Sequence, residues 1–159
     1  MPTLTSPVSR ALAVLASAVA ALMLLAGAAQ AHNRYDGAKS GKVVITIHKR
    51  SQRMTVRVGG VTRHVFRVST GKRGHATPRG SFRALRMARM HYSRKYNMAK
   101  MPYSIFFTSR GHAIHGTGAV SRLGRPASHG CVRLAPGNAA KLYALVKRHG
   151  QRNVVIRVV

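Results

Sequence analysis

One cysteine and two histidines give this sequence its most reactive stretch. Cys131 is the only cysteine in the chain, and Ser-His-Gly at residues 128–130 directly precedes it. A second histidine, His115, lies sixteen residues upstream and is followed by Gly116. A thiol is a good nucleophile only as its thiolate, and a nearby imidazole is the usual base that removes its proton. Glycines allow backbone N–H groups to approach a substrate carbonyl closely. The stretch therefore indicates acyl transfer through a cysteine.

The order of the residues favours this interpretation over a lone cysteine that serves only as a small buried hydrophobe. Ile-His-Gly at 114–116, followed by Ser-His-Gly-Cys-Val-Arg at 128–133, closely resembles the signature of the L,D-transpeptidase catalytic domain, also called YkuD. In that family a His-Gly and a variable loop precede Ser/Thr-His-Gly-Cys, with Arg or Asn two places on. The resemblance implies that Cys131 is the nucleophile and that His115 is the proton donor and acceptor.

A supporting set surrounds the proposed nucleophile and base: Ser128, His129, Gly130 and Gly116. Gly130 and the amide of Cys131 are candidates for an oxyanion hole, and Ser128 for a hydrogen bond within the loop. His129 lies only two residues before the cysteine, and we expect it to shape the site rather than to be the main base. Arg133 is either a bidentate ligand for a substrate carboxylate or one of many solvated arginines, and the sequence leaves both readings open.

The charge balance excludes several kinds of site. The chain of 159 residues has 28 Lys and Arg against one acidic residue, Asp36, which gives a formal net charge of +27. No carboxylate pair exists for a glycosidase or an aspartic protease, and no carboxylate-rich site for Ca²⁺ or Mg²⁺. One cysteine, one acid and no His-x₃₋₅-His pair make a zinc site a weak hypothesis, because His112 and His115 alone are too few ligands, so we expect neither metal nor cofactor. No acid is placed to orient His115, and the partner that we expect, as the family implies, is a main-chain carbonyl.

The resemblance also implies the reaction. Its substrate is the tetrapeptide stem of peptidoglycan, in which the thiol of Cys131 attacks the bond between the L-centre of a diamino acid and the terminal D-alanine. The resulting thioester can react with a second stem, giving a 3→3 cross-link, or with the amine of an outer-membrane protein. Reaction with water would make the enzyme an L,D-carboxypeptidase or hydrolase. The motif leaves these outcomes open because all share one acyl-enzyme.

A second hypothesis rests on the charge alone. An exported protein this cationic would bind anionic cell-envelope polymers by counterion release. Such binding would not need Cys131, whereas transpeptidation would. The predicted export described next disfavours a nucleic-acid partner.

The N-terminal segment predicts export to the periplasm or cell wall. Residues 1–31 contain one charged side chain, Arg10, an apolar run at 11–28, and Ala-Gln-Ala at 29–31, which matches a signal-peptide cleavage site. An uncleaved membrane anchor is the alternative, because the run is nearly long enough to span a bilayer. After cleavage we expect no stable membrane span. An unpaired cysteine in an oxidising compartment is consistent with a reactive thiol.

The remaining chain predicts a short lead-in and one domain. Residues 32–41 are polar and small, which is typical of a flexible segment, and residues 42–159 form the predicted catalytic domain. Apolar, β-branched patterns predict strands at 42–48, 53–58, 61–69, 101–107, 111–115 and 153–159, with the first three joined as a meander. Residues 83–90 are ambiguous, and residues 91–100 and 117–127 have the composition of loops. In the YkuD family a Thr-Pro turn like that of residues 76–82 shapes one edge of the cleft.

The predicted fold class is mainly β, a YkuD-type β-sandwich-like catalytic domain with one α-helix in its C-terminal half. The helix covers residues 138–149, with Pro136 and Asn138 marking its start and Gly150 its end. Asn138 stands where the family often has an Asp, and an asparagine caps a helix comparably well.

Overall fold

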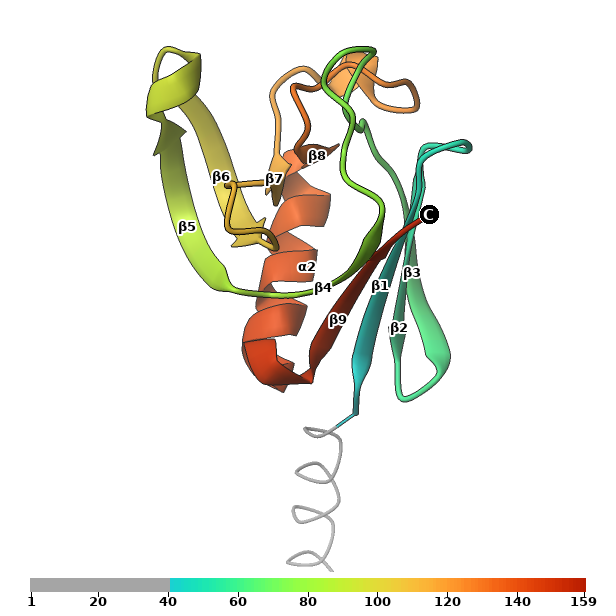
Figure 1. The fold of residues 1–159 in the computed structure, drawn as a ribbon. Helices are drawn as coiled ribbons and strands as arrows, with labels where there is room; N and C mark the ends of the chain where they lie inside the picture. Colours follow the sequence, from blue (N-terminus) through green and yellow to red (C-terminus); the bar gives the residue numbers. More distant parts are fainter. Residues whose placement is uncertain (1–40) are drawn as a thin grey trace, which may run out of the picture. The chain divides into compact units, whose positions relative to one another are not determined.

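The computed structural model describes residues 41–159, which form nine strands in two sheets and one α-helix. The five-stranded sheet has the order β3-β2-β1-β9-β4, and the four-stranded sheet the order β5-β6-β7-β8 (Figure 1). The mainly β fold class is thus confirmed. The predicted signal peptide and all but the last residue of the predicted lead-in lie outside the described residues. Within residues 41–159, no helix has the length and apolar character needed to cross a membrane.

The five-stranded sheet contains the predicted meander. Its strands are β1 (Val43–His48), β2 (Arg53–Val58), β3 (Val61–Arg67), β4 (Gly80–Arg83) and β9 (Val154–Val158). β1, β2 and β3 pair antiparallel, and β9 pairs parallel to β1. Gly59 and Gly60 join β2 to β3 with φ values of 57° and 82°, a conformation that glycine adopts without strain. Alternate residues of β1 are fully buried, as the period of two requires.

The four-stranded sheet corrects one prediction. Its strands are β5 (Arg86–Ser93), β6 (Ala99–Phe106), β7 (Ala113–Gly116) and β8 (Val132–Leu134). The prediction of a loop at residues 91–100 is wrong, because β5 continues to Ser93 and β6 begins at Ala99, with the 3₁₀ turn η2 (Arg94–Tyr96) between them. These strand ends are polar because they leave the core, and the β5–β6 hydrogen bonds hold them together.

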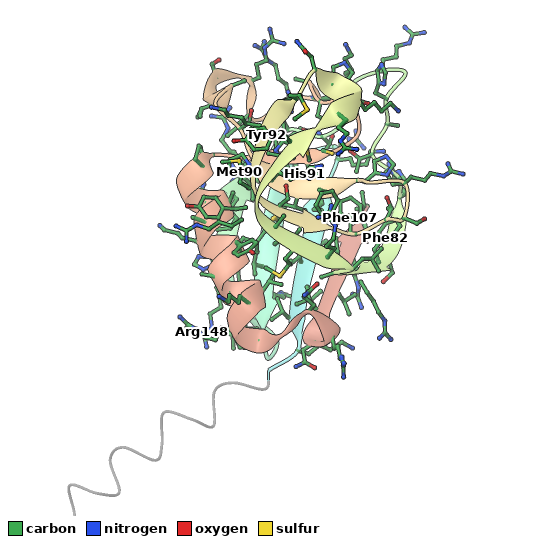
Figure 2. The ribbon with its side chains drawn as sticks, turned by 90° about the vertical axis from the view of Figure 1, so that its left-hand side faces the viewer. Phe82, Met90, His91, Tyr92, Phe107 and Arg148 are labelled. Carbon is green, nitrogen blue, oxygen red and sulfur yellow. The ribbon has the colours of Figure 1, made fainter. Side chains whose placement is uncertain are left out.

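Helix α2 (Pro136–His149) begins two residues earlier than predicted. Pro136 occupies the start of the helix, where its missing N–H costs no hydrogen bond. Asn138 is therefore in the first turn and is not the cap, a position that Ala135 occupies without a side-chain hydrogen bond. The helix ends at Gly150, and the last turn carries cations, among them Arg148 (Figure 2), which the helix dipole favours.

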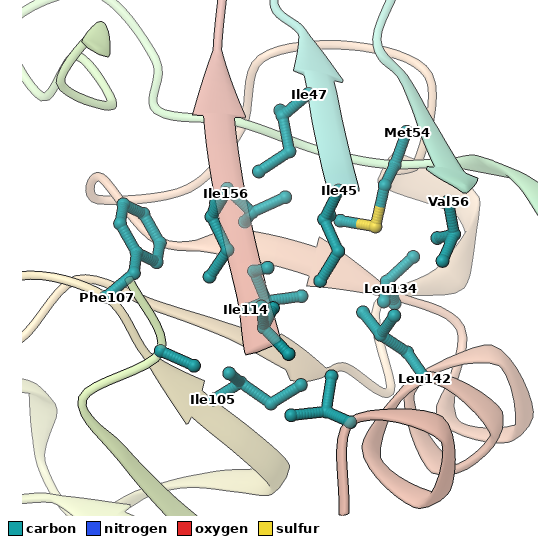
Figure 3. Packing of buried hydrophobic residues seen from close by; sticks show 14 of the residues in the cluster. Ile45, Ile47, Met54, Val56, Ile105, Phe107, Ile114, Leu134, Leu142 and Ile156 are labelled. Atoms are coloured by element: carbon teal, nitrogen blue, oxygen red, sulfur yellow. The ribbon is translucent and has the colours of Figure 1, made fainter. Parts of the chain in front are cut away.

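The helix and both sheets enclose one hydrophobic core (Figure 3). The five-stranded sheet contributes Ile45, Met54 and Ile156, the four-stranded sheet contributes Ile105, Ile114 and Leu134, and α2 contributes Leu142. α2 packs against β6 and β7. Burying one aliphatic side chain of this size contributes roughly 1.5–3 kcal/mol. This packing fixes β7, which contains His115, and β8, which directly follows Cys131.

Candidate active site

The pairing of β7 with β8 places the predicted base in one strand and the predicted nucleophile directly before the neighbouring strand. The two strands are parallel, with Ile114 opposite Val132 and His115 opposite Arg133. Successive side chains point to opposite faces of a sheet. Because Ile114 and Val132 are in the core, His115 and Arg133 lie on the other face. Cys131 directly precedes β8 and packs beside Ala113, which shares that face with His115.

The ring of His115 is held in one orientation by the backbone. Its side chain is buried, and Nδ1 lies 2.8 Å from the carbonyl oxygen of Gly116. A carbonyl oxygen only accepts hydrogen bonds, so Nδ1 carries the proton and donates it, and Nε2 is left as the basic nitrogen. A main-chain carbonyl thus orients His115, as expected for a chain with no suitable acid. Gly116, from the supporting set, supplies it.

Burial makes His115 neutral at physiological pH. The pKa of His115 is lowered to about 4, mainly by desolvation; the hydrogen bond to Gly116 acts in the opposite direction, and Arg133 and His91 add to the lowering. A neutral imidazole is able to accept a proton. The ring is therefore in the form that a general base requires.

Cys131 is a free, half-buried thiol on an apolar surface. It packs against the cluster of Met101, Phe106 and Ala113, and Sγ lies 4.0 Å from the carbonyl oxygen of Gly111. Burial raises the pKa of the Cys131 thiol, while the backbone of Ala113 and the charge of Arg133 act to lower it. The resting pair is consequently a thiol and a neutral imidazole, rather than a thiolate and an imidazolium.

A buried threonine fixes the backbone just before the cysteine. Thr77 is fully buried, and its Oγ1 donates to the carbonyl oxygen of Gly130 at 2.8 Å and accepts from the N–H of Gly71 at 2.9 Å. Because the Gly130–Cys131 peptide is trans, holding its carbonyl toward Thr77 directs the N–H of Cys131 the opposite way. The family resemblance implies that the turn with Thr77 shapes one edge of the cleft, but the sequence gave no sign of this contact.

The remaining members of the supporting set complete the same loop. The hydroxyl of Ser128 donates to the carbonyl of Cys131 and accepts from the N–H of Gly130, as expected for a hydrogen bond within the loop. Gly130 has a φ of +111°, and a Cβ there would lie 3.0 Å from the ring of His112. Only glycine fits this position without strain or displacement.

His129 is exposed and lies at the edge of the site. Its ring stacks on Tyr96 at 4.9 Å between centroids and meets the edge of His75 at 4.8 Å. Tyr96 belongs to η2, so His129 joins the tip of the β5–β6 hairpin to the cysteine loop. Desolvation lowers the pKa of His129, and Lys72, His75 and Arg133 act in the same direction. This position suits a residue that shapes the site.

A cleft of about 1030 Å³ leads to the thiol. Its walls include β5, η2, the end of β6 and the loop before β7, together with His129 and Cys131. Met90, His91 and Tyr92 lie along β5, as Figure 2 shows, and are part of the lining. The rings of Phe106 and His91 meet edge to face, with 5.1 Å between centroids, and the guanidinium carbon of Arg86 lies 3.9 Å from the centre of the Phe106 ring. Among residues 41–159, no cluster of three or more potential ligands is arranged to hold a metal ion.

Comparisons with a family profile and with a known protein both point to the L,D-transpeptidases. The sequence profile of the L,D-transpeptidase catalytic domain (YkuD) matches residues 42–156. YqjB of Bacillus subtilis strain 168, which carries the name of an L,D-transpeptidase, is similar at 27% identity over 118 residues, covering 67% of each chain.

The fold is also similar to solved structures of L,D-transpeptidases. LdtMt1 in complex with imipenem has a TM-score of 0.67 at 25% identity over 75% of this chain and 59% of the other. The enzyme of Stackebrandtia nassauensis has a TM-score of 0.65 at 28% identity, over 77% and 57%. This chain thus spans less than two thirds of the length of these solved chains. From the matching profile and the shared fold, this chain belongs to the L,D-transpeptidase catalytic domain (YkuD) family.

Proposed function

We propose that this protein is an exported, cysteine-dependent L,D-transpeptidase that acts on peptidoglycan tetrapeptide stems. The observation that supports the proposal is the pairing of β7 with β8: Cys131, which directly precedes β8, packs beside Ala113 on the sheet face that also carries His115, a buried, neutral histidine whose Nδ1 donates to a main-chain carbonyl. Geometry of this kind serves nucleophilic catalysis by a thiol.

The first half-reaction forms a thioester. Nε2 of His115 takes the thiol proton as Sγ of Cys131 attacks the carbonyl carbon between the diamino acid and D-alanine. The N–H of Cys131, directed away from Thr77, stabilises the developing oxyanion. The tetrahedral intermediate then collapses, the carbon–nitrogen bond breaks, and the amine of D-alanine leaves with the proton from His115.

The second half-reaction transfers the acyl group. An amine of another stem attacks the thioester carbon and gives its proton to Nε2 of His115. The carbon–sulfur bond breaks, an amide forms, and the cysteine takes the proton back. A protein amine gives attachment to the wall by the same steps, and water gives hydrolysis.

Three substitutions test the assignment. Cys131→Ser should form no acyl-enzyme with a tetrapeptide muropeptide, because an alcohol is much harder to deprotonate than a thiol. His115→Ala should slow acylation by about 10²–10⁴, the usual range for the loss of a general base, and His129→Ala should slow it less. Intact-protein mass spectrometry follows the thioester, and muropeptide analysis identifies the product. If folded His129→Ala were the slower enzyme, the assignment of the base would be wrong.

A carbapenem provides an independent probe of the nucleophile. The similar enzyme LdtMt1 is known in complex with imipenem, and we expect imipenem to add to this protein at Cys131 alone.

N-terminal sequencing tests export, with His32 as the expected first residue of the mature protein.

A second candidate function rests on the charge. The only acidic side chain of the chain is Asp36, which leaves residues 41–159 without an Asp or Glu. If the protein only binds anionic envelope polymers, Cys131→Ser should bind them as well as wild type. If it is a transpeptidase, Cys131→Ser should lose transpeptidation.

A further inference from the structure

A second, strongly basic pocket lies beside the cleft. It has a volume of about 420 Å³ and is lined by the cations Lys72, Arg122, Arg125 and Arg133, together with His129. His129 also lines the cleft that contains Cys131. The two cavities therefore share one side chain as a common wall, with the nucleophile in one cavity and the arginine cluster in the other.

Main-chain hydrogen bonds hold the walls of this basic pocket. The N–H of Gly124 donates to the carbonyl of Val68 at 2.8 Å, in the middle of the segment that carries Arg122 and Arg125. The N–H of Lys72 donates to the carbonyl of Ser128 at 3.0 Å. The cations thus project from segments with fixed backbones, which lowers the entropy lost when they bind a ligand.

Within residues 41–159, the cations of the basic pocket have no carboxylate side chain to pair with, because this part of the chain contains no Asp or Glu. Arg133 is half-buried, and Nη1 makes one long contact, 3.4 Å, with the carbonyl of Ala127. Burial lowers the pKa of Arg133; Cys131 acts in the opposite direction, and the charge of Arg122 adds to the lowering. An anion in this pocket would relieve the repulsion and form charge-assisted, bidentate hydrogen bonds with the guanidinium groups.

We propose that the basic pocket binds a carboxylate of the acceptor stem, so that its amine approaches the thioester from the side of His129 opposite the cleft. This inference rests on the proposed function. During transfer the acyl chain of the donor still occupies the cleft, so the acceptor needs separate space. In a diamino acid with a carboxylate on the carbon that carries the acceptor amine, holding the carboxylate also positions the amine.

The experiment compares two acceptors on one acyl-enzyme. The tetrapeptide donor first acylates Cys131, and mass spectrometry measures the rate of this step. Aminolysis is then measured with an acceptor that has a free carboxylate beside its amine and with the corresponding carboxamide. Wild type should prefer the carboxylate by about tenfold, as one charged hydrogen-bonded contact predicts. The double variant Arg122→Gln, Arg125→Gln should reduce the preference to below about threefold.

A matched control separates the basic pocket from the overall charge. Arg148→Gln, Arg152→Gln removes two positive charges at the end of α2 (Figure 2) and in the following 3₁₀ turn η4 (Gln151–Asn153). This variant has the same net charge as the first and should keep the preference of wild type. Loss of the preference in the pocket variant alone would support the proposal.

The other outcomes overturn it. An equal loss in both variants would assign the preference to bulk charge, and an unchanged preference in the pocket variant would exclude an acceptor site. Slower acylation of the pocket variant with an unchanged preference would assign the basic pocket to the donor. A wild-type protein that forms no acyl-enzyme would instead fail at the first step, which overturns the proposed function and this inference with it.

Discussion

At the scale of single residues, the protonation of Cys131 and His115 follows from their surroundings. Burial raises the pKa of the thiol and lowers the pKa of the imidazole to about 4. Both shifts favour the uncharged forms near pH 7. The charge of Arg133 makes a thiolate easier to form but also makes His115 harder to protonate. Proton transfer is therefore expected during attack on the substrate rather than before it.

Alkylation of Cys131 tests this resting state. Iodoacetamide reacts with the thiolate, so its rate follows the pKa of the thiol. We expect slow alkylation near pH 7 and a rise only on the alkaline side, with the same inflection in His115→Ala. Denatured protein provides the control for the reactivity of an unburied thiol. An inflection near pH 4 that disappears in His115→Ala would indicate a preformed thiolate–imidazolium pair instead.

At the scale of elements, the turn before β4 contacts the loop of the predicted nucleophile through the side chain of Thr77. Thr77 holds the carbonyl of Gly130, 53 positions along the chain, and so sets the direction of the N–H of Cys131. Thr77 is a positioning residue, because it acts on the reacting atoms only through the backbone.

Substitutions at Thr77 separate positioning from stability. Thr77→Val keeps the shape of the side chain but loses the hydroxyl. It should lower kcat for acylation by at least about tenfold, which is a smaller loss than the roughly 10²–10³-fold loss seen when an oxyanion donor itself is removed. KM should change little, and Thr77→Ser should restore most of kcat.

Thr70→Val is the matched control for this experiment. Thr70 is also buried, and its hydroxyl accepts a hydrogen bond from Gln52 at 2.7 Å. Loss of this hydrogen bond in Thr70→Val should reduce the free energy of unfolding without lowering kcat. Equal losses of kcat in the two valine variants would mean that Thr77 contributes only stability.

Local patterns explain which elements the sequence could predict. β1 and β2 alternate between core and surface, and α2 has an apolar face, so each has a short-range signal. The ends of β5 and β6 border the cleft and lie outside the core. The composition around His91 is therefore polar and does not predict a strand, although pairing with β6 makes this segment one. Cys131 and His115 stand in a recognisable motif. The hydrogen bond from Thr77 to Gly130 joins distant segments and leaves no local trace.

At the scale of the whole molecule, the formal charge of +27 has to be balanced from outside. With one acidic residue, the chain has almost no internal salt bridges available to it. We expect the basic surface to hold the enzyme on the anionic wall, while Cys131 and His115 act at contact range. Surface attraction is screened by salt, and contact chemistry much less so.

Two salt titrations test this division. Binding to purified sacculi should weaken steeply once the Debye length falls below about 10 Å, whereas turnover of a small soluble stem peptide should change little. Arg148→Gln, Arg152→Gln should weaken binding to sacculi slightly and leave turnover unchanged. Parallel curves would mean that the charge serves the active site, with Arg133 the first residue to examine. A flat binding curve would mean that the basic surface does not hold the wall.

The positions of the lysines have a practical consequence for chemical cross-linking. Lys95 lines the cleft, and Lys72 lines the basic pocket on the other side of His129. Carbodiimide activates carboxylates for coupling to amines, and residues 41–159 have no acidic side chain to activate. On a mixture with wall fragments, the reagent would therefore activate mainly the carboxylates of the wall. Each adduct on a lysine would record which cavity a stem had entered, with Lys141 on α2 as the background.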